Sequence, residues 1–473
     1  GTTGFPKGVM WRHEDFWRVL GGGIDFYTGE PLDEFDQSKQ ATDPRMTTFP
    51  LSPLMHGGAQ AGLLMHLFAG HLTVLEPKFD PQRTWEIIEA DKVQLIFMTG
   101  DAMARPLIEE YERKKATGTP YDGSSLFAIS SSAAIFSPPV KKRWMDEFTG
   151  AVFTDSIGAT ETGFSGMGMQ DKDAISTDGP VVALGPASVV LDEDNRPIPM
   201  TEIGKIGRLA RGGNIPQGYY KDPEKSAATF IEVDGTRYSV PGDFARIEAD
   251  GKVTLLGRGS NCVNTGGEKV YPEEVEMAIK GHPAVYDTLV VGIPDATYGQ
   301  AVAAVVELRD GQSLELEELR EYLRAHLSGY KLPRSLTVVD TIPRNATGKA
   351  QYPAAKEMAL AAQAASRVSA LSETPVSRSG SSTADHSSSA RSAWASISAG
   401  PCRRWASSAA RTDAASARGR SCAASACRAS AAATPGSSSR PASSAVSRAC
   451  SRTRSAGSRS SWTASRSRAC RKA

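Results

Sequence analysis

Residues 257–276 read Gly-Arg-Gly-Ser-Asn-Cys-Val-Asn-Thr-Gly-Gly-Glu-Lys-Val-Tyr-Pro-Glu-Glu-Val-Glu. An apolar strand is predicted to run into Gly257, and the glycines that follow favour turns because they adopt backbone angles that other residues avoid. Pro272 suits the first turn of a helix, and the glutamates after it favour the positive end of the helix dipole. The stretch therefore predicts a break between a large first part of the chain and a smaller α+β part.

Strand and helix patterns alternate on both sides of this break. Helices are predicted from residue 272 onward and over residues 84–92, 139–148 and 314–327. Strands are predicted over residues 93–98, 126–129, 253–256, 287–293, 301–308 and 336–339. Such alternation favours an α/β fold. We expect a large domain over residues 1–256, a hinge over 257–262 and a small domain over 263–360.

The average charge hides two different parts of the chain. The 473 residues include 54 Lys and Arg against 53 Asp and Glu, a net charge of +1. Residues 361–473 hold 18 of the basic residues and three of the acidic ones, which leaves the first 360 residues with a net charge of −14. The last part is mostly Ser, Ala, Arg, Gly and Pro, and it is predicted to be disordered because it has too few large apolar side chains to offset the entropy of ordering.

Two hypotheses explain this arginine-rich part. A charge of +15 and repeated Ser-Arg pairs suit an arm that binds nucleic acid through its phosphates. Arg outnumbers Lys seventeen to one, however, and the aromatic residues are limited to Trp394, Trp405 and Trp462. That composition is what a GC-rich gene yields in the wrong reading frame, which is the hypothesis we favour. No nucleic-acid partner is expected for the first 360 residues.

Several classes of protein are excluded by the sequence. No apolar run reaches the roughly 18 residues that a membrane-spanning helix needs, although peripheral membrane contact stays open. The chain has neither an initiator Met nor a recognisable leader, and it opens inside a motif, so we expect a fragment. Cys262 is the one cysteine before residue 361, which fits a cytoplasmic protein without disulfides.

The opening residues, Gly1-Thr2-Thr3-Gly4-Phe5-Pro6-Lys7-Gly8, have the composition of a loop that cradles phosphate. Glycines permit close backbone approach, hydroxyls donate hydrogen bonds, and Lys7 adds charge. The loop lacks the Gly-Lys-Ser/Thr ending of a Walker A motif. A plain glycine turn before a helix is the alternative.

Three further strings carry polar groups that suit nucleotide chemistry. Residues 155–163, Asp-Ser-Ile-Gly-Ala-Thr-Glu-Thr-Gly, place a hydroxyl beside a carboxylate, which suits phosphate and Mg²⁺. A helix N-cap at Thr160 is the alternative. Asp243, in Pro-Gly-Asp, suits ribose hydroxyls or a surface turn, and Lys349 follows the last strand on a loop where a solvated lysine is the alternative.

Taken in order, these strings resemble those of the adenylate-forming superfamily of acyl-CoA synthetases, peptide-synthetase adenylation domains and luciferases. The resemblance covers residues 1 to about 357. Residues 53–58 resemble the acyl-pocket and gate segment, residues 131–133 the adenine-side stretch, and residues 218–230 the segment that ends the large domain.

The resemblance implies a two-step ligase that uses ATP, Mg²⁺ and CoA. A carboxylate would attack the α-phosphate to give an acyl-adenylate, and the CoA thiol would then displace AMP. The implied catalytic residues are Lys349, Thr160 and Glu161, with Glu161 also holding the metal. The implied nucleotide and CoA contacts are Thr2, Thr3, Gly4, Lys7, Ser131, Ser132, Ala133, Ile157, Gly158, Asp243, Arg258, Gly266 and Gly267, and those to the acid are His56, Gly57 and Gly58.

Four positions depart from the family pattern. Ile157 replaces an aromatic residue that stacks on adenine, and Pro241 replaces the usual Thr before Gly-Asp. Ser260 stands at the hinge where Asp or Lys is commoner, and Pro353 stands where Arg is often found. Because the first residues of the phosphate loop precede Gly1, the chain as written is expected to lack part of the active site.

Within the superfamily, residues 10–15, 156–158 and 240–243 look most like those of actinobacterial-type CoA ligases for fatty acids and steroid side-chain acids. That resemblance implies a bulky hydrophobic acid. Glycines 21–23 and 57–58 would make room for it, or they serve packing and turns. A relative that stops at the adenylate, or that passes the acyl group to a carrier protein, is the alternative to a CoA ligase.

Overall fold

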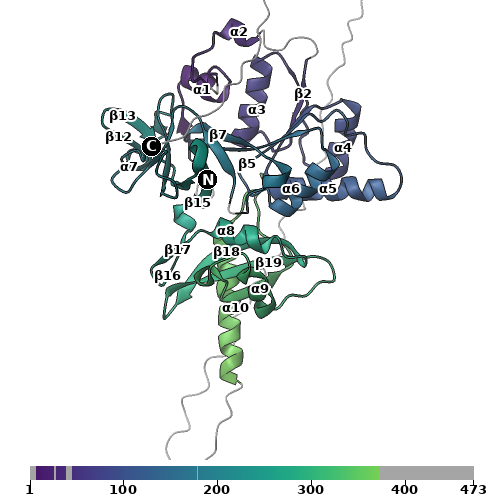
Figure 1. Cartoon of the computed structure of the whole chain (residues 1–473), viewed down its shortest axis with the longest axis vertical. Coiled ribbons are helices and arrows are strands. Elements are labelled where there is room, and N and C mark those ends of the chain that lie inside the picture. Colours follow the sequence, from purple (N-terminus) through teal and green to yellow (C-terminus); the bar gives the residue numbers. More distant parts are fainter. Residues whose placement is uncertain (1–6, 26–27, 39–44, 178, 373–473) are drawn as a thin grey trace, which may run out of the picture. The chain divides into compact units, whose positions relative to one another are not determined.

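The structure is a computed structural model that describes residues 7–25, 28–38, 45–177 and 179–372 (Figure 1). All of these residues belong to one compact unit. The predictions made for Thr2, Thr3 and Gly4, and those for the chain after residue 372, lie outside the described residues.

Parallel strands form one half of the large sheet. Its strands lie in the order β3 (Leu72–Thr73), β2 (Thr47–Pro50), β4 (Leu95–Met98), β5 (Ala128–Ser132) and β6 (Val152–Ala159). Helices α4 (Pro81–Ala90), α5 (Gly100–Ala116) and α6 (Pro138–Glu147) connect them. Trp85 and Trp144 lie in the hydrophobic core that these helices form with the strands, and neither has exposed surface. Carboxyl ends of parallel strands are where α/β sheets bind ligands, and β4, β5 and β6 all end on one edge.

The sheet continues beyond β6 in antiparallel pairing. Its order is β6, β7 (Gly163–Met169), β8 (Val181–Leu184), β15 (Lys252–Arg258), β14 (Asp243–Ile247), β10 (Ile206–Arg211), β13 (Thr236–Ser239) and β12 (Phe230–Val233), with β9 (Ser188–Leu191) on β10. Thr160 and Glu161 lie in the turn of the β6–β7 hairpin. The alternative reading of Thr160 as a helix N-cap is therefore wrong, because no helix begins there.

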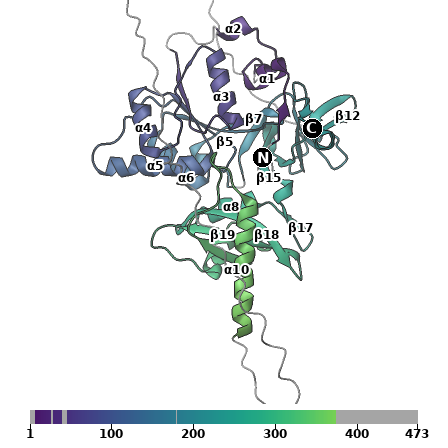
Figure 2. The same ribbon diagram turned by 180° about the vertical axis from the view of Figure 1, so that it is seen from behind.

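A separate sheet follows the Gly257 stretch, with strand order β17 (Glu268–Val270), β16 (Val263–Thr265), β19 (Gly299–Leu308) and β18 (Val285–Asp295), and with β20 (Ser335–Val339) parallel to β19. Apolar side chains cover both faces of this sheet. One core packs against α8 (Pro272–Ile279) and α9 (Leu316–Arg324), and the other packs against α10 (Tyr352–Ser372), which extends from the sheet (Figure 2).

Shorter elements complete the description. They are β1 (Val9–Met10), β11 (Gly218–Tyr219), α1 (His13–Leu20), α2 (Glu34–Ser38), α3 (Gly57–Phe68), α7 (Pro223–Thr229) and 3₁₀ turns at Lys172–Ala174, Ala249–Gly251, Gly259–Asn261 and Gly329–Lys331. Among the described residues, no helix has the length and apolar character needed to cross a bilayer.

The predicted α/β fold with a large first domain and a small second one is confirmed. The predicted elements are present with ends shifted by a few residues. The strand predicted over residues 126–129, for example, is β5 over 128–132, because Leu126 lies in the turn that precedes it.

Candidate active site

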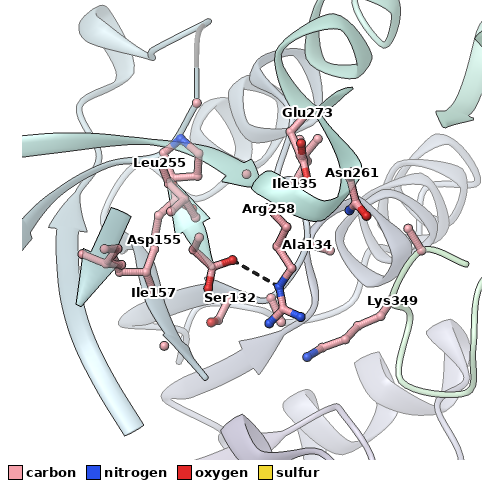
Figure 3. A pocket seen from close by; sticks show the side chains of 18 of the residues that line it. Ser132, Ala134, Ile135, Asp155, Ile157, Leu255, Arg258, Asn261, Glu273 and Lys349 are labelled. Carbon is pink, nitrogen blue, oxygen red and sulfur yellow. Dashed lines mark hydrogen bonds and ion pairs between the residues drawn. The ribbon is translucent and has the colours of Figure 1, made fainter. Parts of the chain in front are cut away.

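A cavity of about 250 Å³ lies where β5 and β6 end (Figure 3). One wall comes from the large sheet and includes Ser131, Ser132, Ala133, Ile157 and Gly158. The opposite wall comes from the Gly257 stretch, from α8 and from the loop after β20. The cavity is therefore lined by residues from both sides of the predicted break at residues 257–262.

Asp243 and Arg258 face each other across neighbouring strands of this cavity. They are partners in the β14–β15 register, and Arg258 Nε donates to Asp243 Oδ1 at 3.2 Å. Burial raises the pKa of the Asp243 carboxyl, whereas the Arg258 guanidinium lowers it. Both predicted ribose-binding residues therefore lie together on the cavity wall.

Lys349 enters the cavity from the loop between β20 and α10. Asn345 Oδ1 accepts hydrogen bonds from the backbone N–H groups of Thr347 and Lys349, which fixes the turn. Arg258 and Lys349 point into the same space in Figure 3. Burial lowers the pKa of the Lys349 ammonium and Arg258 lowers it further, while Glu161 and Asp243 raise it. Lys349 is half-buried, so it is not the solvated surface lysine of the alternative reading.

The turn that carries Thr160 and Glu161 is held from several sides. Trp11 Nε1 donates to the Thr160 carbonyl at 3.0 Å, and Ser239 Oγ donates to the Glu161 carbonyl at 2.7 Å. Arg211 Nη1 donates to the carbonyls of Thr162 and Phe164. The Tyr219 hydroxyl donates to Glu161 Oε1 at 2.8 Å, and burial followed by this bond raises the pKa of Tyr219 to about 12.

A second cavity, of about 550 Å³, adjoins the first. Much of its wall is apolar, with side chains from α1, α3 and the neighbouring strands that include Trp11, Phe16, Val19, Met65, Phe97 and Met167. Residues 131–133 and 156–158 line both cavities, and so does Lys349. A ligand with an apolar body and a polar end can therefore place that end beside Lys349.

His56, Gly57 and Gly58, the residues expected to contact the acid, line this second cavity. Burial and then the Lys349 charge lower the pKa of His56 to about 4, so the ring is neutral at pH 7. A Cβ on Gly57 would lie 3.2 Å from Thr160 Oγ1, which shows how closely α3 approaches the hairpin turn. Gly22 also lines the cavity, whereas a Cβ on Gly21 or Gly23 would collide with Trp17, so these two glycines serve packing.

Three of the predicted site residues, Gly266, Gly267 and Lys7, line neither cavity. Gly266 and Gly267 form the exposed turn between β16 and β17 and line neither cavity. Lys7 is exposed, and its Nζ lies 5.3 Å from the centre of the Tyr219 ring.

The positions that depart from the family pattern lie in the cavity walls. Ile157 is buried in the wall of the smaller cavity and belongs to the hydrophobic core behind it. Ser260, Pro241 and Pro353, at positions that depart from the family pattern, line the smaller cavity.

Sequence reasoning missed a pair of carboxylates in the smaller cavity. Glu273 and Glu276 lie three residues apart on α8, the spacing that places two side chains on one helix face. Burial, and the proximity of Glu276, raise the pKa of Glu273 to about 8, and burial raises that of Glu276 to about 7. Glutamates in the first turn of a helix are typical of the helix dipole effect, and the i, i+3 spacing is the signal that identifies the pair.

A buried ionic cluster joins α5 to the second sheet. Lys280 Nζ lies 3.2 Å from Asp101 Oδ2 and 2.8 Å from Asp287 Oδ1, and Arg344 pairs with Asp287 at 2.7 Å. Lys280 and Arg344 lower the pKa of Asp287 against the effect of burial. The cluster holds the loop of Lys349 close to the large sheet, because Arg344 lies on that loop.

Comparison with known proteins agrees with this arrangement. The profile of the AMP-binding enzyme family matches residues 1–220, and that of the AMP-binding enzyme C-terminal domain matches residues 274–349. A 3-oxocholest-4-en-26-oate–CoA ligase of Rhodococcus rhodochrous is 53% identical over 360 residues, 76% of this chain and 65% of that protein. A medium/long-chain-fatty-acid–CoA/3-oxocholest-4-en-26-oate–CoA ligase of Mycolicibacterium smegmatis is 51% identical with the same coverage.

Among solved structures, ATP-bound MatB from Rhodopseudomonas palustris superposes with a TM-score of 0.62 at 26% identity, over 76% of this chain and 66% of MatB. The chain thus spans about 65% of the length of the curated relatives that it matches.

Proposed function

The chain belongs to the AMP-binding enzyme family, and from that premise we propose that it is an acyl-CoA synthetase for a hydrophobic carboxylic acid. The observation that carries the proposal is that Lys349 lines two adjoining cavities, one that also holds the charged pair Asp243 and Arg258 and one whose wall is largely apolar. The partners are small molecules: the acid, ATP and CoA. Cys262, the one cysteine in the first 360 residues, supports a cytoplasmic location.

In the first step, a carboxylate oxygen of the acid attacks the α-phosphorus of ATP. The bond between this phosphorus and the oxygen that bridges it to the β-phosphate breaks, and pyrophosphate leaves. The two reacting groups are both negatively charged, so positioning and charge neutralisation matter more than a base. Lys349 supplies a positive charge between them, and Asp243 accepts hydrogen bonds from the ribose hydroxyls, with Arg258 beside it.

Thr160 and Lys7, with Thr2 and Thr3, would bind the phosphates, and residues 131–133 and 157–158 would lie against adenine. The residues present fit magnesium. The described part of the chain contains no cluster of three His, Cys, Asp or Glu residues able to hold a metal, whereas Mg²⁺ is usually bound through one or two carboxylates plus phosphate oxygens. Glu161 would be that carboxylate. Magnesium, when bound, neutralises charge on the leaving pyrophosphate.

In the second step, the CoA thiolate attacks the acyl carbonyl carbon, and the bond to the AMP oxygen breaks. We propose that Gly266 and Gly267 line the path of the thiol after residues 263–360 rotate about the 257–262 hinge. Their exposed position away from both cavities supports such a movement, because the turn must move to reach the acyl group.

The apolar cavity of about 550 Å³ supports a fatty acid or a steroid side-chain acid as the substrate. The printed names of the Rhodococcus and Mycolicibacterium relatives support the same classes. His56, Gly57 and Gly58 would contact the acid.

The test is product analysis with a panel of acids graded by chain length and ring content. We expect an acyl-CoA thioester and AMP in equal amounts, formed only when the acid, ATP and CoA are all present. Acyl-adenylate without thioester would favour the alternative enzyme that does not use free CoA. Absence of both products with every acid would contradict the proposal.

A further inference from the structure

The hydroxyl of Tyr219 makes a direct contact with the carboxylate assigned to the metal. It donates to Glu161 Oε1 at 2.8 Å, and Tyr219 as a whole is 5% exposed. The other anchors of the hairpin turn, Trp11, Ser239 and Arg211, bond backbone carbonyls. Among these contacts, the bond from Tyr219 is therefore the one that determines which way the carboxylate points.

Tyr219 itself is fixed by its surroundings. Its backbone N–H donates to Ser226 Oγ at 2.8 Å, and its ring packs edge-on against Phe230 with centroids 5.8 Å apart. Its strand β11 pairs with β1 in the register Val9 to Tyr219. With the backbone and the ring both held, the position of the hydroxyl is set before any ligand binds.

The same ring also has Lys7 over its face. Lys7 Nζ lies 5.3 Å from the centre of the Tyr219 ring, within the range of a cation–π interaction. Lys7 lies two residues before β1, and Tyr219 lies in β11. The pairing of β1 with β11 therefore fixes the position of Lys7 relative to Tyr219. Tyr219 thus contacts one candidate phosphate-binding residue with its ring and the candidate metal-binding residue with its hydroxyl.

We propose that Tyr219 is a positioning residue that orients Glu161 toward a divalent cation bound to the nucleotide triphosphate and holds Lys7 next to it. The inference rests on the proposed function for the role of Glu161. With Oε1 held by the tyrosine, Oε2 would be the oxygen that holds the cation. Residues that orient metal ligands in this way typically change metal affinity by about 10- to 100-fold when they are replaced.

The experiment measures binding of Mn²⁺–ATP to the full chain by electron paramagnetic resonance, which reports the fraction of bound Mn²⁺ directly. Tyr219→Phe keeps the ring, and with it the Phe230 and Lys7 contacts, but removes the hydroxyl. Tyr220→Phe is the matched control, because Tyr220 is the next residue, is 62% exposed and has Lys221 over its ring. Glu161→Gln shows the effect of removing the carboxylate charge itself.

We expect Tyr219→Phe to weaken Mn²⁺–ATP binding by about 10- to 100-fold and Tyr220→Phe to leave it within about twofold. Binding of metal-free ATP should be nearly equal in the two variants, and circular dichroism should show the same fold. Equal Mn²⁺–ATP affinity for the two variants would overturn the proposal, as would an equal loss of metal-free ATP binding.

Measurements of adenylate formation distinguish a failure of this inference from a failure of the proposed function. In Tyr219→Phe, a higher Mg²⁺ concentration should restore the rate of adenylate formation, because the defect is in affinity for the cation and not in kcat. Wild-type protein that binds Mn²⁺–ATP yet forms no adenylate with any acid would contradict the proposed ligase, while the binding comparison would still decide the role of Tyr219.

Discussion

Single residues explain how the site is charged. Asp243, Arg258 and Lys349 all line one cavity, in which Arg258 Nε donates to Asp243 Oδ1 at 3.2 Å. Tyr219 and Glu273 were not singled out for the site, because a tyrosine in a strand and a glutamate in the first turn of a helix have ordinary structural roles. Their contacts depend on residues 58 positions away for Tyr219 and on the burial of the helix for Glu273, which local patterns do not report.

Asp243→Asn tests the ribose contact. The substitution keeps the size of the side chain but removes its charge and one acceptor, and hydrogen bonds to charged groups contribute about 1.5–3 kcal/mol. We expect the Kd for ATP, measured by calorimetry, to rise by about 10- to 100-fold. Asp250→Asn is the control, since Asp250 lies in an exposed turn. Equal ATP affinity of the two variants would show that Asp243 does not contact the nucleotide.

Elements explain how these residues come together. The sequence predicted the strands and helices because apolar periodicity is local. It did not predict that β6 changes from parallel pairing with β5 to antiparallel pairing with β7, nor that β8 pairs with β15. The β8–β15 pairing joins segments about 70 residues apart in the chain, and the change of direction at β6 depends on how the whole sheet packs. They turn residues 160–162 into a hairpin turn where a local reading favours an N-cap.

The end of β15 gives a test at this scale. Gly257 has φ +119°, and a Cβ there would lie 2.1 Å from Glu273 Oε2. Gly251 also has positive φ, at +69°, but a Cβ would meet nothing within 4 Å. We expect Gly257→Ala to lower the free energy of unfolding by about 1–3 kcal/mol more than Gly251→Ala, as measured with urea. Equal losses would mean that α8 does not pack on the hinge in this way.

The whole molecule combines a candidate catalytic body with an arginine-rich part of opposite charge. The net charge of +1 is therefore an average of two unlike parts and describes neither. Within the body, carboxylates are buried next to the cavity as well as paired in the cluster around Lys280. This arrangement predicts how the stability of the fold depends on pH.

Folded protein holds protons on Glu273 and Glu276 at pH values where the unfolded chain has lost them, because their pKa values rise from 4.5 to about 8 and about 7. The free energy of unfolding should therefore decrease as the pH rises from about 5 to about 8. Glu273→Gln should reduce this decrease by roughly 1–3 kcal/mol, measured with urea at several pH values. Glu268→Gln, on the exposed strand β17, should not change it. A pH dependence that Glu273→Gln leaves intact would contradict the burial of this carboxylate.

Adenylate formation that depends on Lys349 is tested by isotope exchange between pyrophosphate and ATP, measured with and without the acid in wild type, Lys349→Ala and Lys252→Ala. Lys252 is an exposed lysine on β15 and serves as the control. We expect acid-dependent exchange that Lys349→Ala lowers by about 100-fold or more and Lys252→Ala leaves unchanged. Exchange that does not require the acid, or that survives in Lys349→Ala, would contradict this expectation.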